Sequence, residues 1–197
     1  MNFLAHAYLA GPDTAIQLGG LIGDFVKGPL PAGLPKNVAA GVKLHRRIDS
    51  FADAHPAFLR SRSRISAARR RVAGIMVDLF YDHFLALRWT EFAPDSLQAR
   101  TGALYALMHE HMELLPPRLQ EILPRMSDAD WFGSYASSAA IAATIDRMAR
   151  HRLSRPALLE GGGEELLVSY AGFEADFRAF LPDALAFSGE WLAQHRF

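Results

Sequence analysis

The sequence predicts an all-α protein, a single-domain helical bundle that spans residues 1–197. Hydrophobic residues recur with a helical period along most of the chain, and no segment shows the strict alternation that marks an amphipathic strand. Half of the residues are hydrophobic and 21% are charged, a composition typical of globular proteins. A chain of 197 residues is long enough to bury one core and does not need two.

Local signals place the first three helices. Asn2 and Asp13 are suited to cap the first two, because their side chains can accept hydrogen bonds from free backbone N–H groups. Gly28-Pro29 ends the second helix, since proline cannot continue a helical ladder. A third helix is predicted from about residue 36 to residue 51, followed by a break near His55-Pro56.

The longest central helix is predicted from roughly residue 66 to residue 89. Its second half, Val72–Trp89, is apolar nearly all round, which is typical of a helix at the centre of a bundle. Proline and glycine residues divide the rest of the chain into amphipathic segments. Further helices are predicted near residues 95–115, 117–124, 128–151 and 164–195.

The composition restricts the kinds of metal site and the compartment. The chain has no cysteine, which excludes disulfides, iron–sulfur clusters and thiolate zinc sites. Any metal must therefore be held by histidine nitrogen and carboxylate oxygen. The first residues lack the basic leader of a signal peptide, and no apolar stretch is long enough to span a bilayer. We therefore expect a cytoplasmic protein with no membrane or nucleic-acid partner.

The net charge of zero conceals an uneven distribution of charge. Residues 43–71 contain nine basic residues against Asp49 and Asp53, and residues 160–190 contain seven acidic residues against Arg178. Such a chain can present a basic face to an acidic partner. The alternative is that both segments are ordinary solvated helix faces.

Histidine and aspartate residues interrupt several apolar helix faces. Asp24 lies in an apolar run, and a buried carboxylate is usually paired, protonated or bound to a cation. His45 and Asp49 are four residues apart and so share a helix face. The carboxylates with the same spacing on the central helix would repel each other unless a cation lies between them. With His6 in the first helix, these residues predict a metal site, and the alternative is a set of structural acids and histidines. The two carboxylates on the central helix are Asp78 and Asp82.

Five short motifs resemble the acyl carrier protein phosphodiesterase family, and they occur in that family's order with similar spacing. The resemblance covers roughly residues 1–90. The motifs are Asn2–His6, Gly23–Gly28, His45–Asp49, Asp53–Pro56 and Asp82–Leu85.

This resemblance implies a metal-dependent hydrolase with a fold like a distorted HD phosphohydrolase domain. The cofactor would be a divalent cation, usually Mn²⁺ in this family, although Mg²⁺ or Fe²⁺ also suits such ligands. The partner and substrate would be holo-acyl carrier protein, and the products 4′-phosphopantetheine and the apo carrier. The chain departs from the HD pattern, because Asp82-His83 has the reverse order and a helical turn separates His45 from Asp49.

Residue roles follow from the motifs and from this implied chemistry. The expected metal ligands and their immediate supports are His6, Asp24, His45, Asp49, Asp78 and Asp82. Asp24 is also expected to be catalytic, Arg46 or Arg47 to bind the phosphate, and His83 or His55 to protonate the leaving serine oxygen. The run that ends with Arg69, Arg70 and Arg71 is expected to bind the acidic carrier protein.

Two other functions fit the same residues. An HD-like phosphohydrolase of a nucleotide or another small phosphoester would use an identical metal site. A non-catalytic helical binding domain would use the histidines and aspartates only to satisfy one another.

Overall fold

The computed structural model describes residues 2–152 and 156–195, and within these residues every regular element is helical. The α-helices are α1 (Phe3–Leu9), α2 (Thr14–Ile22), α3 (Lys36–Ala54), α4 (Pro56–Arg64), α5 (Ala73–Leu87), α6 (Trp89–Phe92), α7 (Leu97–Glu110), α8 (Pro117–Asp128), α9 (Trp131–Ser134), α10 (Ser138–Arg152), α11 (Gly163–Val168) and α12 (Tyr170–Gln194). Short 3₁₀ helices are η1 (Gly23–Phe25), η2 (Ala67–Val72), η3 (Met112–Leu114) and η4 (Pro156–Leu158). The all-α prediction is confirmed.

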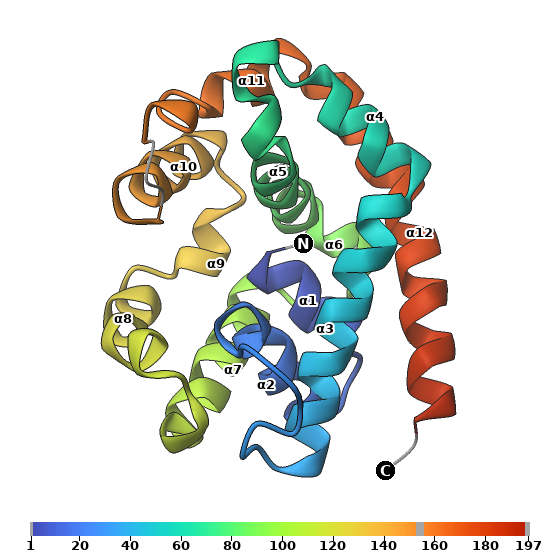
Figure 1. The fold of residues 1–197 in the computed structure, drawn as a ribbon, viewed down its shortest axis with the longest axis vertical. Coiled ribbons are helices and arrows are strands. Elements are labelled where there is room, and N and C mark those ends of the chain that lie inside the picture. Colours follow the sequence, from blue (N-terminus) through green and yellow to red (C-terminus); the bar gives the residue numbers. More distant parts are fainter. Residues whose placement is uncertain (1, 153–155, 196–197) are drawn as a thin grey trace.

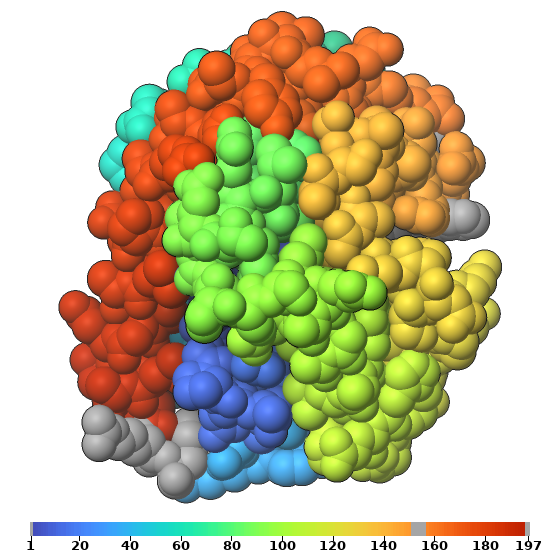
Figure 2. Space-filling view, turned by 180° about the vertical axis from the view of Figure 1, so that it is seen from behind, coloured from blue at the N-terminus to red at the C-terminus, as the bar shows by residue number. Residues whose placement is uncertain are grey.

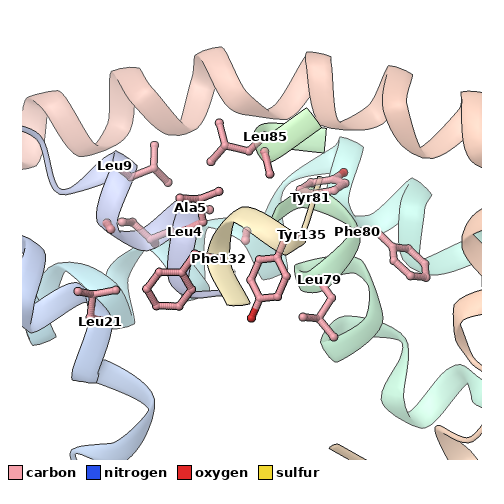
Figure 3. Packing of buried hydrophobic residues seen from close by; sticks show 14 of the residues in the cluster. Leu4, Ala5, Leu9, Leu21, Leu79, Phe80, Tyr81, Leu85, Phe132 and Tyr135 are labelled. Carbon is pink, nitrogen blue, oxygen red and sulfur yellow. The ribbon is translucent and has the colours of Figure 1, made fainter. Parts of the chain in front are cut away.

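Helix α5 lies at the centre of the molecule, as its apolar sequence predicted (Figure 1). Its neighbours include α1, α4, α10 and α12. In Figure 3, Leu4 and Ala5 of α1 lie close to Phe132 of α9, and Leu79 of α5 lies farther along the same buried cluster. Phenylalanines of α5 and α12 extend this core on the other side, and burial of each contributes about 1.5–3 kcal/mol. The core therefore fixes α1 against α5.

Several predicted helices are shorter in the structure than the hydrophobic period suggested. The segment predicted as one helix from 66 to 89 is η2 followed by α5. The segment predicted from 164 to 195 is divided at Ser169 into α11 and α12, and the one from 128 to 151 into α9 and α10. In each case the apolar pattern continues across a turn, because both pieces pack on the same core.

Helices α2 and α3 cross with their backbones in close approach. A Cβ atom on Gly19 would overlap the carbonyl group of Val38, and one on Gly41 would overlap the carbonyl group of Ile16. Glycine at both positions allows a separation that larger residues would prevent. This crossing brings α3 close to α1, which packs on α2.

Helix α12 runs along one edge of the molecule and carries acidic residues that pair with α4 (Figure 2). The buried carboxylate of Asp176 accepts hydrogen bonds from Arg60 Nε at 2.8 Å, Arg64 Nε at 2.9 Å and the hydroxyl of Ser61 at 3.2 Å. Part of the basic segment therefore binds the acidic segment of the same chain. Among the described residues, no helix is both long enough and apolar enough to cross a membrane.

Candidate metal centre

Side chains from α1 and α3 meet in a compact cluster of His6, His45 and Asp49. Asp49 lies between the histidines, with Oδ1 at 3.1 Å from His6 Nε2 and Oδ2 at 3.3 Å from His45 Nε2. The imidazole rings stack with their centroids 3.6 Å apart. Each of the three residues offers a ligand atom within 4.8 Å of the others. The structure thus brings together three of the predicted metal ligands.

Helix α2 positions the two histidines. The backbone carbonyl of Gly20 accepts a hydrogen bond from His45 Nδ1 at 2.8 Å, so the proton is on Nδ1 and Nε2 faces the cluster. A Cβ atom at Gly23 would overlap the His45 ring, and one at Gly20 would press on the backbone of His6. Gly20 of α2 therefore allows the backbone of His6 to approach, and Gly23, at the start of η1, makes room for the His45 ring.

The charges in the cluster give its members different protonation states. Burial and the neighbouring His45 together lower the pKa of His6 to about 3, so His6 is neutral. Burial also lowers the pKa of His45, but hydrogen bonds to Asp24 and Asp49 outweigh it and raise the value to about 9. For Asp49, burial raises the pKa, but the two histidines hold it well below its usual range.

The cluster opens into a cavity of about 460 Å³. Asp24, Asp49 and Asp78 line it from three different elements, so it concentrates negative charge. Asp24 Oδ1 lies 3.5 Å from His45 Nε2, and burial raises the pKa of Asp78. The expectation that Asp24 is buried is wrong: its side chain is 49% exposed, because it lies in the 3₁₀ turn that ends α2.

Asp82 has a different environment from the cluster. Its carboxylate accepts hydrogen bonds from the backbone N–H of Leu4 at 2.9 Å and of Ala5 at 3.1 Å. These are N–H groups of the first turn of α1, which a capping side chain normally satisfies. The structure therefore accounts for the burial of Asp82 without a cation. Its assignment as a metal ligand stays a prediction.

His83, on the same helix, contacts residues outside the cluster. Its Nδ1 lies 2.7 Å from the carbonyl oxygen of Tyr135, and its Nε2 lies 2.9 Å from the hydroxyl of Tyr170. His55 caps α4, because its Nδ1 accepts from the N–H of Ala57, and its Nε2 lies 3.0 Å from Asp183. Neither histidine lines the cavity, and both roles in proton transfer stay predictions.

The predicted substrate-binding arginines are dispersed. Arg46 donates to the carbonyl groups of Val26 and Gly28 at 2.9 Å each, and so secures the loop after η1. Arg69 donates to Glu165 and to the carbonyl of Glu160. The remaining three are exposed on the surface, and none lines the cavity; they are Arg47, Arg70 and Arg71.

Two cavity residues were not predicted from the sequence. Lys27 is exposed and lines the cavity beside the aspartates, where its ammonium group can reach a bound anion. Asn2 also lines it, although it was expected only to cap the first helix, and its side chain makes no capping hydrogen bond. Both residues lie in the recognised motifs, which was the available signal for their role.

The donor set fits a hard divalent cation. Imidazole nitrogen and carboxylate oxygen are the ligands that Mn²⁺, Mg²⁺ and Fe²⁺ share. The hydrogen bond from His45 Nδ1 to Gly20 leaves Nε2 to act as a ligand, which is the usual support of a metal-binding histidine. The donor atoms of the cluster therefore suit such a cation.

Known proteins are similar to this chain over nearly its full length. A family model described as acyl carrier protein phosphodiesterase matches residues 1–184. A protein of Photorhabdus laumondii subsp. laumondii named acyl carrier protein phosphodiesterase is 37% identical over 92% of each chain. Relatives with the same name from Serratia proteamaculans (34% identical, covering 94% of this chain and 96% of the relative) and Pectobacterium atrosepticum (33%, 92% and 94%) are also similar. No solved structure matches the chain.

Proposed function

The chain belongs to the acyl carrier protein phosphodiesterase family, and from this premise we propose that it hydrolyses holo-acyl carrier protein in a metal-dependent reaction. Water would replace the serine oxygen of the carrier at phosphorus. The products would be 4′-phosphopantetheine and the apo carrier with a free serine hydroxyl.

The observation that carries this proposal is the cluster of His6, His45 and Asp49 at the wall of a cavity rich in carboxylates. A phosphodiester is anionic and resists attack by nucleophiles. A divalent cation held by this cluster would neutralise phosphate charge and lower the pKa of water. Mn²⁺ is our first choice, with Mg²⁺ and Fe²⁺ as alternatives. We assign Asp24 and Asp78 as additional ligands or hydrogen-bond acceptors of the water.

The other cavity residues would bind and orient the substrate. Lys27 would pair with a phosphate oxygen, because it brings a positive charge to the same cavity. Asp24, half exposed and hydrogen-bonded to His45, would accept a proton from the attacking water at its carboxylate. Asp82 would act indirectly, because it holds the first turn of α1 and thereby positions His6.

Mass spectrometry tests the reaction directly. We expect purified protein with Mn²⁺ to convert holo-acyl carrier protein to the apo form, with 4′-phosphopantetheine as the second product. Excess chelator should stop the conversion, and Mn²⁺ should restore it. The proposal fails if the metal-loaded protein leaves the carrier intact. Cleavage of a small phosphoester alone would favour the small-substrate alternative.

A further inference from the structure

A second cavity adjoins the cavity of about 460 Å³ beside the cluster of His6, His45 and Asp49. It has a volume of about 800 Å³ and lies between α8, α9, α10 and the start of α1. Asn2 and Met148 line both cavities, so the second opens beside the reaction centre of the first. We refer to the second cavity as the α8–α10 groove.

Three arginines line this groove. Arg118 and Arg125 are exposed on α8, and no carboxylate of residues 2–152 and 156–195 lies within ion-pair distance of either. By contrast, Arg60, Arg64 and Arg69 all form salt bridges with acids of α11 or α12. The first two positive charges are therefore available to a partner.

The third arginine, Arg147 of α10, is held in position. Its guanidinium lies 4.3 Å from the ring centroid of Trp131, and it donates a hydrogen bond to Thr144 at 2.9 Å. A cation stacked on an indole loses little conformational freedom when a carboxylate binds it. The groove therefore contains one guanidinium that is held in position and two that are exposed.

The rest of the groove is largely apolar. Phe3, Ile122 and Trp131 are half-buried and line it together with the arginines. Glu121 and Asp128 also line it, so the positive charge of the lining is confined to the three arginines and exceeds the negative charge by one. A groove with an apolar floor and separate cationic points complements an amphipathic helix with acids on its flanks.

We propose that the α8–α10 groove docks an acidic amphipathic helix of the carrier protein and so presents the modified serine to the metal centre. This inference rests on the proposed function, which supplies a protein substrate. The predicted docking residues Arg69, Arg70 and Arg71 line neither cavity, and Arg69 is bound by Glu165. The groove shares lining residues with the cavity beside the cluster, a direct connection that the η2 segment lacks.

Binding of the apo carrier provides the test, because the apo form has the docking helix but not the phosphopantetheine arm. The variants are Arg118→Glu, Arg125→Glu and the double variant, measured by calorimetry at low salt. We expect the double variant to weaken binding about tenfold or more, and salt to reduce the difference. Lys43→Glu is the matched control, since Lys43 is exposed on α3 and lines neither cavity.

Unchanged thermal unfolding and Mn²⁺ binding show that each variant remains intact. Reversing an acid of the carrier helix to lysine should partly restore its binding to the double variant, which a folding defect would not allow. The inference is wrong if the double variant binds the apo carrier as tightly as Lys43→Glu does. It is also wrong if only the holo carrier is affected, because the groove would then hold the arm. Wild-type protein that does not cleave the holo carrier would instead refute the proposed function itself.

Discussion

His45 contacts a partner through each of its ring nitrogens. Nδ1 donates to the carbonyl of Gly20, and Nε2 faces Asp24 and Asp49. Without a cation, the two carboxylates keep a proton on Nε2 and raise the pKa of His45 to about 9. A metal ion that binds at Nε2 must displace this proton, so metal binding and protonation compete at one atom.

We therefore predict that Mn²⁺ affinity rises with pH from about 6.5 toward about 9 and that binding near pH 7.5 releases the His45 proton. His6 contributes no proton, because its pKa is lowered to about 3 by burial and by His45. Calorimetry in buffers of different ionisation enthalpy measures the release. Affinity that is constant over this range, with no proton released, would contradict the assignment.

The same pKa values determine how the stability of the metal-free protein changes with pH. The folded pKa of His45 exceeds its unfolded value of 6.5, so its contribution is complete below pH 6.5 and is lost as pH rises through about 9. The folded pKa of His6 is below 6.5, so its contribution is lost as pH falls from 6.5 toward about 3. The metal-free protein should therefore be most stable near pH 6.5, and its stability should fall as pH rises from there through about 9 and as pH falls toward about 3.

Asp49 and Asp82 should respond differently to removal of their charge. Asp49→Asn removes the group between the two histidines and should reduce Mn²⁺ affinity by about 100-fold or more. Asp82→Asn leaves a first-turn N–H of α1 without its acceptor and should cost about 1–3 kcal/mol of unfolding free energy, with a smaller effect on affinity. Thermal unfolding and Mn²⁺ titration separate the two effects. Loss of bound metal at unchanged stability in Asp82→Asn would instead identify Asp82 as a ligand.

Spacing along the sequence predicted some contacts of these aspartates and not others. The spacing of His45 and Asp49 predicted a shared helix face, and the structure confirms that they meet. The same spacing at Asp78 and Asp82 suggested a shared cation. The first turn of α1 supplies donors to Asp82, a contact that joins residues 78 positions apart, and the shared cation stays a prediction. No local pattern could reveal that contact.

The cluster of His6, His45 and Asp49 depends on how closely helices α1 and α3 approach α2. Gly19 and Gly20 of α2 permit this approach, and Gly23, which directly follows α2, leaves space for the His45 ring. The motif Gly23–Gly28 can be identified in the sequence. The steric role of Gly23 depends on how the helices cross, which the sequence does not reveal. Helix boundaries such as Ser169 were missed for a related reason, since both α11 and α12 bury apolar residues in one core.

Gly23→Ala tests this role of α2. A Cβ atom at residue 23 would displace the His45 imidazole, while the core residues of α2 and α3 stay unchanged. We expect Mn²⁺ affinity to fall at least about tenfold, with a smaller loss of stability than a core truncation causes. Gly102→Ala in α7 is the control, because a Cβ atom there meets nothing within 4 Å and Gly102 lines neither cavity. Equal Mn²⁺ affinity in both variants would exclude steric control of His45 by Gly23.

At the scale of the whole molecule, the centre joins segments that are far apart in the sequence. The cluster and its cavity draw on α1, η1, α3 and α5, and α10 closes the cavity through Met148. The network of Asp176 with Arg60 and Arg64 joins α4 to α12 on another part of the molecule. In our proposal the cluster of His6, His45 and Asp49 binds a cation, whereas the Asp176 network has its partners within the protein. Their contributions to stability should therefore separate.

We predict that Mn²⁺ raises the unfolding temperature of the wild type in a concentration-dependent way. Ligand that binds only the folded state contributes about 2.7 kcal/mol at one hundred times its dissociation constant. His45→Ala should abolish this shift, because it removes a ligand atom from the cluster. Asp176→Ala should lower the unfolding temperature with and without Mn²⁺, since it leaves two arginines unpaired, but should preserve the metal-induced shift. Calorimetric scans over a range of Mn²⁺ concentrations measure both. A metal-induced shift that persists in His45→Ala would contradict the assignment of the metal to the cluster of α1 and α3. A shift that disappears in Asp176→Ala while metal still binds would contradict it as well.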